Sequence, residues 1–206
     1  MYVACHYGHY DIVQVLVQSR GDEFRNYHRP LYAASFMGYV DIAHFLVRHG
    51  ADVNATSQEV SRSSSSGHVE VDLDGATPLF AACQNGHVRV ARFLVDKGEA
   101  SVDLPRLDGT TPLHVACQEG HAEVVALLLA NTTNVNVALE DGNSPLGAAS
   151  HFGHVPIVHQ LLANAANVHH SNALGKSPLL IASEMGRLDV VRVLLPVAEV
   201  DQIDHV

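Results

Sequence analysis

A Pro-Leu pair recurs along this chain, and its spacing constrains the fold more than any other feature. The pairs begin at Pro30, Pro78, Pro112, Pro145 and Pro178, at intervals of 48, 34, 33 and 33 residues. Glycines recur with a similar period at Gly8, Gly38, Gly86, Gly120, Gly153 and Gly186. A period near 33 residues indicates a stack of small repeated units rather than one globular core.

Residues 108–129, DGTTPLHVACQEGHAEVVALLL, show what one repeat contains. The Asp-Gly pair predicts a turn. Thr111 before Pro112 is typical of a helix N-cap followed by proline at the first helical position. Gly120 breaks this short helix, and His121 begins a second one with apolar residues at helical spacing. Two short helices cannot bury their apolar sides alone, so each unit needs neighbours of the same kind.

This unit resembles the ankyrin repeat, whose pattern is roughly G-x-T-P-L-H-x-A-A-x-x-G-H-x-x-V-V-x-x-L-L-x-x-G-A-D-V-N. The best match is 109–136, followed by 75–103, 142–169 and 175–201, and 29–54 carries the second half of the pattern. The resemblance implies an all-α solenoid of about six helix–turn–helix units joined by short β-hairpin turns.

One array is therefore expected over the whole chain, with no second domain. The expected repeats are 1–26, 27–56, 72–105, 106–138, 139–171 and 172–206, with a flexible Ser-rich insertion at 57–71. The first repeat lacks its turn, and the last residues resemble the entry to a further repeat. We therefore expect this array to be a fragment of a longer protein.

Composition and charge exclude several classes of function. The formal net charge of −10 argues against sequence-independent binding of nucleic acid and against anionic membrane surfaces. No apolar run approaches the roughly 18 residues that a membrane span needs, and no signal peptide is visible. We expect a chain that binds no nucleic acid and does not insert into a membrane.

The three cysteines occupy equivalent places in their repeats. Cys5, Cys83 and Cys117 stand at the small-residue position before the glycine, where a free thiol packs in the core. Stacked helices lie about 8–10 Å apart, which is too far for a disulfide between Cys83 and Cys117. Reduced thiols suit the cytosol or the nucleus.

Several places depart from the repeat. Residues 20–28 predict an irregular connector. The insertion at 57–71 is polar and low in complexity; we interpret it as a tolerated spacer, with a phosphorylation site as the alternative. Thr132 and Ala165 stand where glycine is expected, and a left-handed conformation there costs roughly 1–2 kcal/mol, so we expect another closure. Pro196 is expected to stop the last helix.

No pattern predicts catalysis, a metal site or a bound cofactor. The histidine pairs His6/His9 and His151/His154 each straddle the glycine break, so their rings do not share one helical face. The chain has no Cys-x-x-Cys pair and no His-Glu-x-x-His helix. It also has no Gly-rich phosphate loop and no Gly-x-Ser-x-Gly elbow.

The resemblance assigns structural roles to other polar residues. It implies that the histidine after each glycine bonds to the backbone of a neighbouring hairpin, and that His114 pairs with Thr111. Asn54 and Asn136 hold a hairpin position at which some ankyrin-repeat proteins are hydroxylated. We favour a structural asparagine at both.

The resemblance also implies binding of proteins through the hairpin tips and the solvent face of the first helices. The helix positions just before each glycine include aromatic and Met side chains, which are enriched in interface cores. The alternative is that Phe36 and Phe152 tuck between helices. The candidate partner-binding residues are Tyr7, Phe36, Met37, Gln84, Asn85, Gln118, Glu119, His151, Phe152, Glu184 and Met185, with Asp108, Glu140 and Asp141 at the tips. The tips also carry Asp74, Ala76, Leu107, Thr110, Asn143, Leu174 and Lys176.

The acidic residues of this set predict a basic partner segment. The leading function is therefore a non-catalytic, monomeric protein–protein interaction module that presents a concave surface. The alternative is a targeting or regulatory segment of a larger enzyme, such as a kinase or a ubiquitin-ligase substrate receptor.

Overall fold

The computed structural model describes residues 1–20, 28–56, 75–132 and 134–203. The chain divides into two compact units, Met1–Asp108 and Gly109–Val206. Within the described residues all regular elements are helices, twelve in number, as the all-α prediction requires. The connector expected at 20–28 and the insertion expected at 57–71 lie almost wholly outside the described residues.

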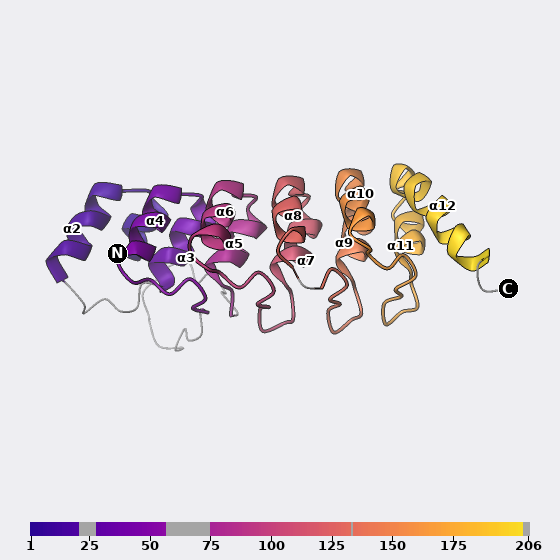
Figure 1. Cartoon of the computed structure of the whole chain (residues 1–206), viewed down its shortest axis with the longest axis horizontal. Helices are drawn as coiled ribbons and strands as arrows, with labels where there is room; N and C mark the ends of the chain where they lie inside the picture. Colours follow the sequence, from indigo (N-terminus) through magenta and orange to yellow (C-terminus); the bar gives the residue numbers. More distant parts are fainter. Residues whose placement is uncertain (21–27, 57–74, 133, 204–206) are drawn as a thin grey trace. The chain divides into compact units, whose positions relative to one another are not determined.

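In the first unit three helix pairs lie side by side (Figure 1). The first helices α1, α3 and α5 pack in a row, and the second helices α2, α4 and α6 form a layer beside them. The bounds are α1 Tyr2–His6, α2 Tyr10–Arg20, α3 His28–Met37, α4 Val40–Arg48, α5 Pro78–Gln84 and α6 Val88–Asp96.

The second unit repeats this arrangement. Its first helices α7, α9 and α11 pack in sequence, and α10 contacts both α8 and α12 in the second layer. The bounds are α7 Pro112–Glu119, α8 Ala122–Leu129, α9 Pro145–Phe152, α10 Val155–Ala163, α11 Pro178–Glu184 and α12 Leu188–Ile203. Between the layers of each unit lie alanines of the first helices and leucines of the second, such as Leu46 and Leu161, with no exposed side-chain area.

The predicted N-caps begin four first helices. Thr77, Thr111, Ser144 and Ser177 each accept a hydrogen bond from the backbone N–H three residues later. A proline follows each of them at the first helical position, where the absence of an N–H costs nothing. These caps fix where each first helix starts, and so fix the register of the row.

The helix-ending glycines hold consecutive pairs together. Gly120 has a φ of +83°, and the ring of His154 from the next pair lies where a Cβ would point, at 2.7 Å. His154 Nε2 donates to the carbonyl oxygen of Gln118 at 3.0 Å. His87 does the same for the carbonyl of Phe36 at 2.8 Å. For these two histidines the implied bond to neighbouring backbone is confirmed.

The turns at Thr132 and Ala165, which follow second helices, were both predicted to avoid a left-handed residue, and only one of them does. Thr132 avoids positive φ, and its N–H donates to Leu128 O at 2.7 Å, as expected. Ala165 does adopt the left-handed conformation, with φ +60°, so the prediction was wrong there. Its turn keeps the Ala166 N–H to Leu161 O bond of 3.0 Å. That closing bond requires the left-handed residue before it and outweighs the strain.

The prediction that Pro196 ends the last helix was also wrong. α12 runs through Pro196 to Ile203. A proline has the φ of a helix and removes a single backbone hydrogen bond, so a helix can continue past it at a cost. Residues 198–203 are therefore helical and do not form the entry to another repeat.

Backbone hydrogen bonds hold the hairpin turns of the second unit. The described residues of these turns form no β-strand. Leu139 N–H donates to Asn143 O at 3.0 Å, and Asn172 N–H donates to Lys176 O at 3.1 Å. Consecutive tips are also joined, because Ala173 N–H donates to Asp141 O at 2.8 Å.

Candidate functional site

The pre-glycine surface is the set of residues just before the glycine that ends each first helix. In the first unit, Tyr7 of this surface is 64% exposed. Phe36 and Met37 are half-buried, and the Phe36 ring stacks on Tyr32 with 6.1 Å between centroids. Phe36 is therefore partly a core residue, as the alternative interpretation had it, and Tyr7 is the ring that solvent reaches most easily.

The polar members in the first unit are half-buried. Asn85 lies at the end of α5 and its side-chain amide donates to Ala81 O at 3.0 Å. Gln84 beside it is also half-buried. Asn85 thus completes a helix end, and its side chain has a structural role that the sequence prediction missed.

The second unit presents a more open pre-glycine surface. Phe152 is 43% exposed at the end of α9, and Met185 is 41% exposed directly after the adjacent helix α11. His151, Glu119 and Glu184 are exposed as well, and Gln118 is half-buried. The Phe152 ring meets His151 edge-on at 4.7 Å. Phe152 does not tuck between the helices.

Some acidic candidates already have partners. Glu184 Oε2 lies 2.7 Å from Lys176 Nζ, and Asp108 Oδ2 lies 3.6 Å from an Arg106 guanidinium nitrogen. Glu119 accepts a hydrogen bond from the Gln118 amide at 3.0 Å. These contacts are partly exposed, so each contributes little stability, but the cations reduce the negative charge that a basic partner would meet.

The hairpin tips differ in what they offer a partner. Leu107 and Leu174 are largely exposed apolar tips. Glu140 and Asp141 are exposed acids beside each other. Ala76 is buried, so it cannot serve as a contact, and Asp74 lies outside the described residues.

The sequence analysis did not predict one side-chain contact near the hairpin tips. The Arg106 guanidinium lies 5.3 Å from the centroid of the Phe80 ring, a cation–π distance. No local pattern signals this contact, because the two residues come from a hairpin and from α5. It folds the arginine back onto the first helices of its unit.

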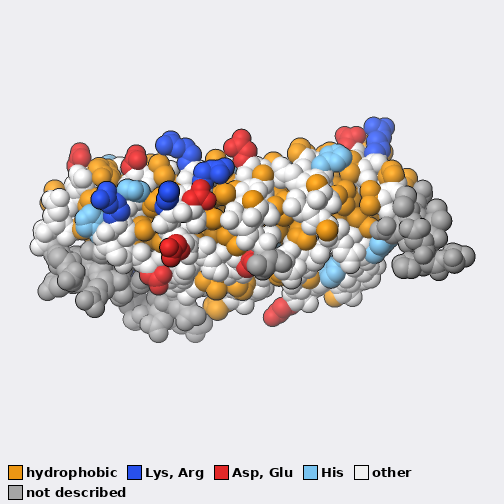
Figure 2. Space-filling model, viewed as in Figure 1, with side chains coloured by type: hydrophobic (Ala, Val, Ile, Leu, Met, Phe, Trp, Pro, Cys, Tyr) orange, Lys and Arg blue, Asp and Glu red, His pale blue; other side chains and the backbone are white. Residues whose placement is uncertain are grey.

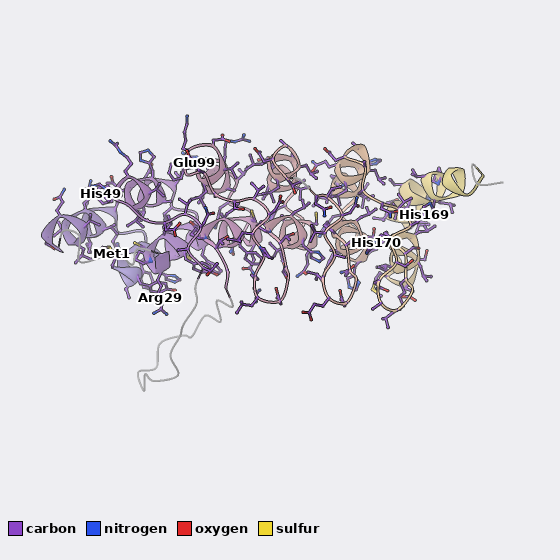
Figure 3. The ribbon with its side chains drawn as sticks, turned by 60° about the horizontal axis from the view of Figure 1, so that its bottom comes forward. Met1, Arg29, His49, Glu99, His169 and His170 are labelled. Carbon is purple, nitrogen blue, oxygen red and sulfur yellow. The ribbon has the colours of Figure 1, made fainter. Side chains whose placement is uncertain are left out.

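The described histidines form no cluster that could hold a metal ion. Among the described residues, no group of three or more His, Cys, Asp or Glu side chains is placed to hold a metal ion. His169 and His170 are labelled in Figure 3, where they lie on the connection before α11. His170 Nε2 donates to Gly142 O at 3.0 Å, which ties this connection to the preceding tip.

The two hairpin asparagines link consecutive repeats. Asn54 Oδ1 accepts the backbone N–H of Ser101 at 2.8 Å, and Asn136 Oδ1 accepts that of Asn167 at 2.8 Å. Both carboxamides therefore have the structural role that the sequence analysis favoured.

The three thiols are free and fully buried. Burial raises the pKa of Cys5 to about 12, and burial also raises the pKa values of Cys83 and Cys117. The thiols therefore stay protonated and unreactive at neutral pH. Their place in the core confirms the packing role predicted for them.

These observations define a class of protein first. Each unit is a row of helix pairs joined by capped turns, with cross-repeat bonds from histidine and asparagine. A family model described as "Ankyrin repeats (3 copies)" matches residues 1–57, 61–139 and 129–204. The chain belongs to the ankyrin-repeat family, whose members are generally protein–protein interaction modules.

Two further findings bear on function. A search of curated proteins finds no match to the chain. Among the described residues, no helix combines the length and the apolar character needed to cross a membrane.

Proposed function

We propose that this chain is a non-catalytic module that binds a partner protein on its pre-glycine surface. The observation that carries the proposal is the exposure of Phe152 and Met185 at the ends of the neighbouring helices α9 and α11. An exposed aromatic ring and an exposed Met side chain on consecutive repeats offer apolar anchors of the kind that dominates interface energies. α9 and α11 are fixed by capped N-termini, so the site needs little ordering on binding.

The partner segment is basic. Residues 109–206 contain nine Asp and Glu against three Lys and Arg. Glu119, Glu140 and Asp141 are exposed in this unit. Over the first unit, Lys and Arg side chains lie among Asp and Glu side chains (Figure 2). Acidic groups around the anchor site raise the association rate with a cationic segment, and salt weakens this effect.

Cytosol or nucleus is the proposed location. Three buried free thiols support it, because a reducing compartment keeps such cysteines free.

The test compares binding by matched variants. Phe152→Ala/Met185→Ala removes the anchor side chains, and Leu188→Ala/Val197→Ala removes apolar side chains of α12 that are also exposed but lie outside the pre-glycine surface and the hairpin tips. Affinity enrichment from lysate with mass spectrometry should recover a partner with the natural chain and the second variant, and lose it with the first. Recovery by all three proteins would refute the proposed site. Circular dichroism should show equal helix content throughout.

A further inference from the structure

Three exposed side chains form a row across the second unit, each directly before a helix-ending glycine. They are Glu119, Phe152 and Met185, which follow one another at intervals of 33 residues. Glu119 is exposed, and Phe152 and Met185 are 43% and 41% exposed. Because α7, α9 and α11 pack in sequence (Figure 1), one acidic and two apolar side chains stand on consecutive repeats. We call these three residues the anchor row.

The anchor row has a regular spacing. Packed helices lie about 8–10 Å apart, and stacked repeats share one register. Neighbouring members of the row therefore lie about 8–10 Å apart. A segment that contacts all three has to present side chains along one edge at this interval.

The apolar part of the row is one side chain wide. The Phe152 ring lies between two imidazoles, with His151 edge-on at 4.7 Å and His154 nearly parallel to it at 6.2 Å between centroids. In the next repeat the same two positions carry the exposed side chains of Glu184 and Arg187. Polar side chains therefore border the apolar anchors on both sides.

Of the regular backbone forms, polyproline II fits this geometry best. It has three residues per turn and rises about 9.3 Å per turn, so residues i, i+3 and i+6 share one edge at the spacing of the row. In a β-strand, three residues cover about 10 Å, but the third side chain points to the opposite face. An α-helix covers about 10.5 Å in seven residues, but it docks through a stripe wider than one side chain.

The polar groups of the row also suit such a segment. The carbonyl groups of a polyproline II backbone make no internal hydrogen bonds, so they are free to accept bonds from a binding surface. The exposed imidazole of His151, beside the Phe152 ring, can donate one. The carboxylate of Glu119 selects a basic residue at one end of the segment.

We propose that the anchor row binds a polyproline II segment of the partner protein. Its basic residue lies at Glu119, and apolar residues three and six positions along the segment lie on Phe152 and Met185. The inference rests on the proposed function, and it adds the backbone form and the residue spacing of the segment that this site recognises.

Fluorescence anisotropy with labelled, end-capped peptides and the purified chain tests the spacing. The matched peptide is Arg-Pro-Pro-Leu-Pro-Pro-Leu, and Arg-Pro-Pro-Leu-Pro-Leu-Pro has the same composition but moves the last leucine to another edge. Both are also made in reverse order, because either chain direction can place the three side chains on the row. In at least one direction the matched peptide should bind about tenfold more tightly than its control.

Variants of the chain test the location. Phe152→Ala/Met185→Ala should weaken binding of the matched peptide about tenfold, whereas Leu188→Ala/Val197→Ala should leave it unchanged. Glu119→Gln should remove the preference for the matched peptide over a counterpart with Gln in place of Arg. Circular dichroism of each variant establishes that it is folded.

Three results would overturn the inference. They are no binding of either matched peptide up to about 1 mM, equal binding of matched and control peptides, and binding that Phe152→Ala/Met185→Ala leaves unchanged. The lysate comparison shows whether the proposed function fails with it. If that variant loses a lysate partner while the peptides do not bind, the partner site stands and only the polyproline II inference falls.

Discussion

Replacing Gly120 by alanine tests the contact that joins consecutive helix pairs. Gly120 ends α7 in the left-handed conformation, with φ +83°. An added Cβ would lie 2.7 Å from the His154 ring. The ring must then move, and its hydrogen bond to Gln118 O is lost.

The cost of Gly120→Ala has three parts. Alanine in the left-handed conformation costs about 1–2 kcal/mol, and the lost hydrogen bond costs about 1 kcal/mol. The lower entropy of the unfolded alanine chain offsets this by about 0.4–1 kcal/mol. The expected net loss of stability is about 2 kcal/mol.

Gly186 supplies the matched control. It holds the equivalent place in the last repeat, with φ +67°, and nothing lies within 4 Å of its added Cβ. Gly186→Ala should therefore cost about 1 kcal/mol, from backbone strain alone. Urea unfolding followed by circular dichroism at 222 nm gives both values, provided that the slope with urea concentration stays the same.

The excess cost at Gly120 should depend on His154. In a His154→Ala background, Gly120→Ala should cost no more than Gly186→Ala does in the natural chain. Equal costs at the two glycines in the natural chain, within about 0.3 kcal/mol, would refute the reasoning that the histidine ring locks one pair to the next.

Three further predictions concern caps, turns and thiols. Thr111→Ala removes the N-cap of α7 and should lower unfolding stability by about 1 kcal/mol, whereas Thr111→Ser should change it little; urea titration measures both. Ala165→Gly relieves left-handed strain and should raise stability by up to about 1 kcal/mol in the same assay, and a loss would contradict the assignment. Cys5, Cys83 and Cys117 should resist a thiol reagent at pH 8 and react fully in urea, because burial raises their pKa values; rapid labelling of the native chain, read by mass spectrometry, would contradict their burial.

Local chemistry made most of the fold predictable. The Thr-Pro and Ser-Pro pairs fix helix starts by a hydrogen bond that spans three residues, as Thr77 and Ser144 show. The apolar spacing of the second helices and the small residues of the first decide which sides are buried. All of these signals act within one repeat, so the sequence displays them directly.

Contacts between repeats were harder to predict. Tyr39 and Arg187 stand where other repeats have histidine, yet each covers the preceding glycine, with Tyr39 over Gly8 and Arg187 over Gly153. Arg187 Nε even donates to His151 O at 2.9 Å, as a histidine would. The geometry of the stack decides these contacts, and several side chains can satisfy it.

The candidate site was predictable in position and less so in detail. The repeat pattern placed both Phe36 and Phe152 just before a helix-ending glycine, Phe36 two residues and Phe152 one residue before it, but only the structure distinguishes the half-buried ring of the first from the exposed ring of the second. The difference arises partly because Phe36 stacks on Tyr32, four residues earlier on α3, whereas the residue four positions before Phe152 is Ala148, which has no ring.

Site-specific photo-crosslinking in cells tests the central claim most directly. A benzophenone side chain replaces Phe152 on α9 in one protein and the exposed Ala126 on α8 in another. If the pre-glycine surface binds a partner, irradiation should join a discrete protein to position 152 and none to position 126, and in cell lysate the yield should fall as added salt rises. Equal adducts at both positions, or adducts at position 126 alone, would contradict the account.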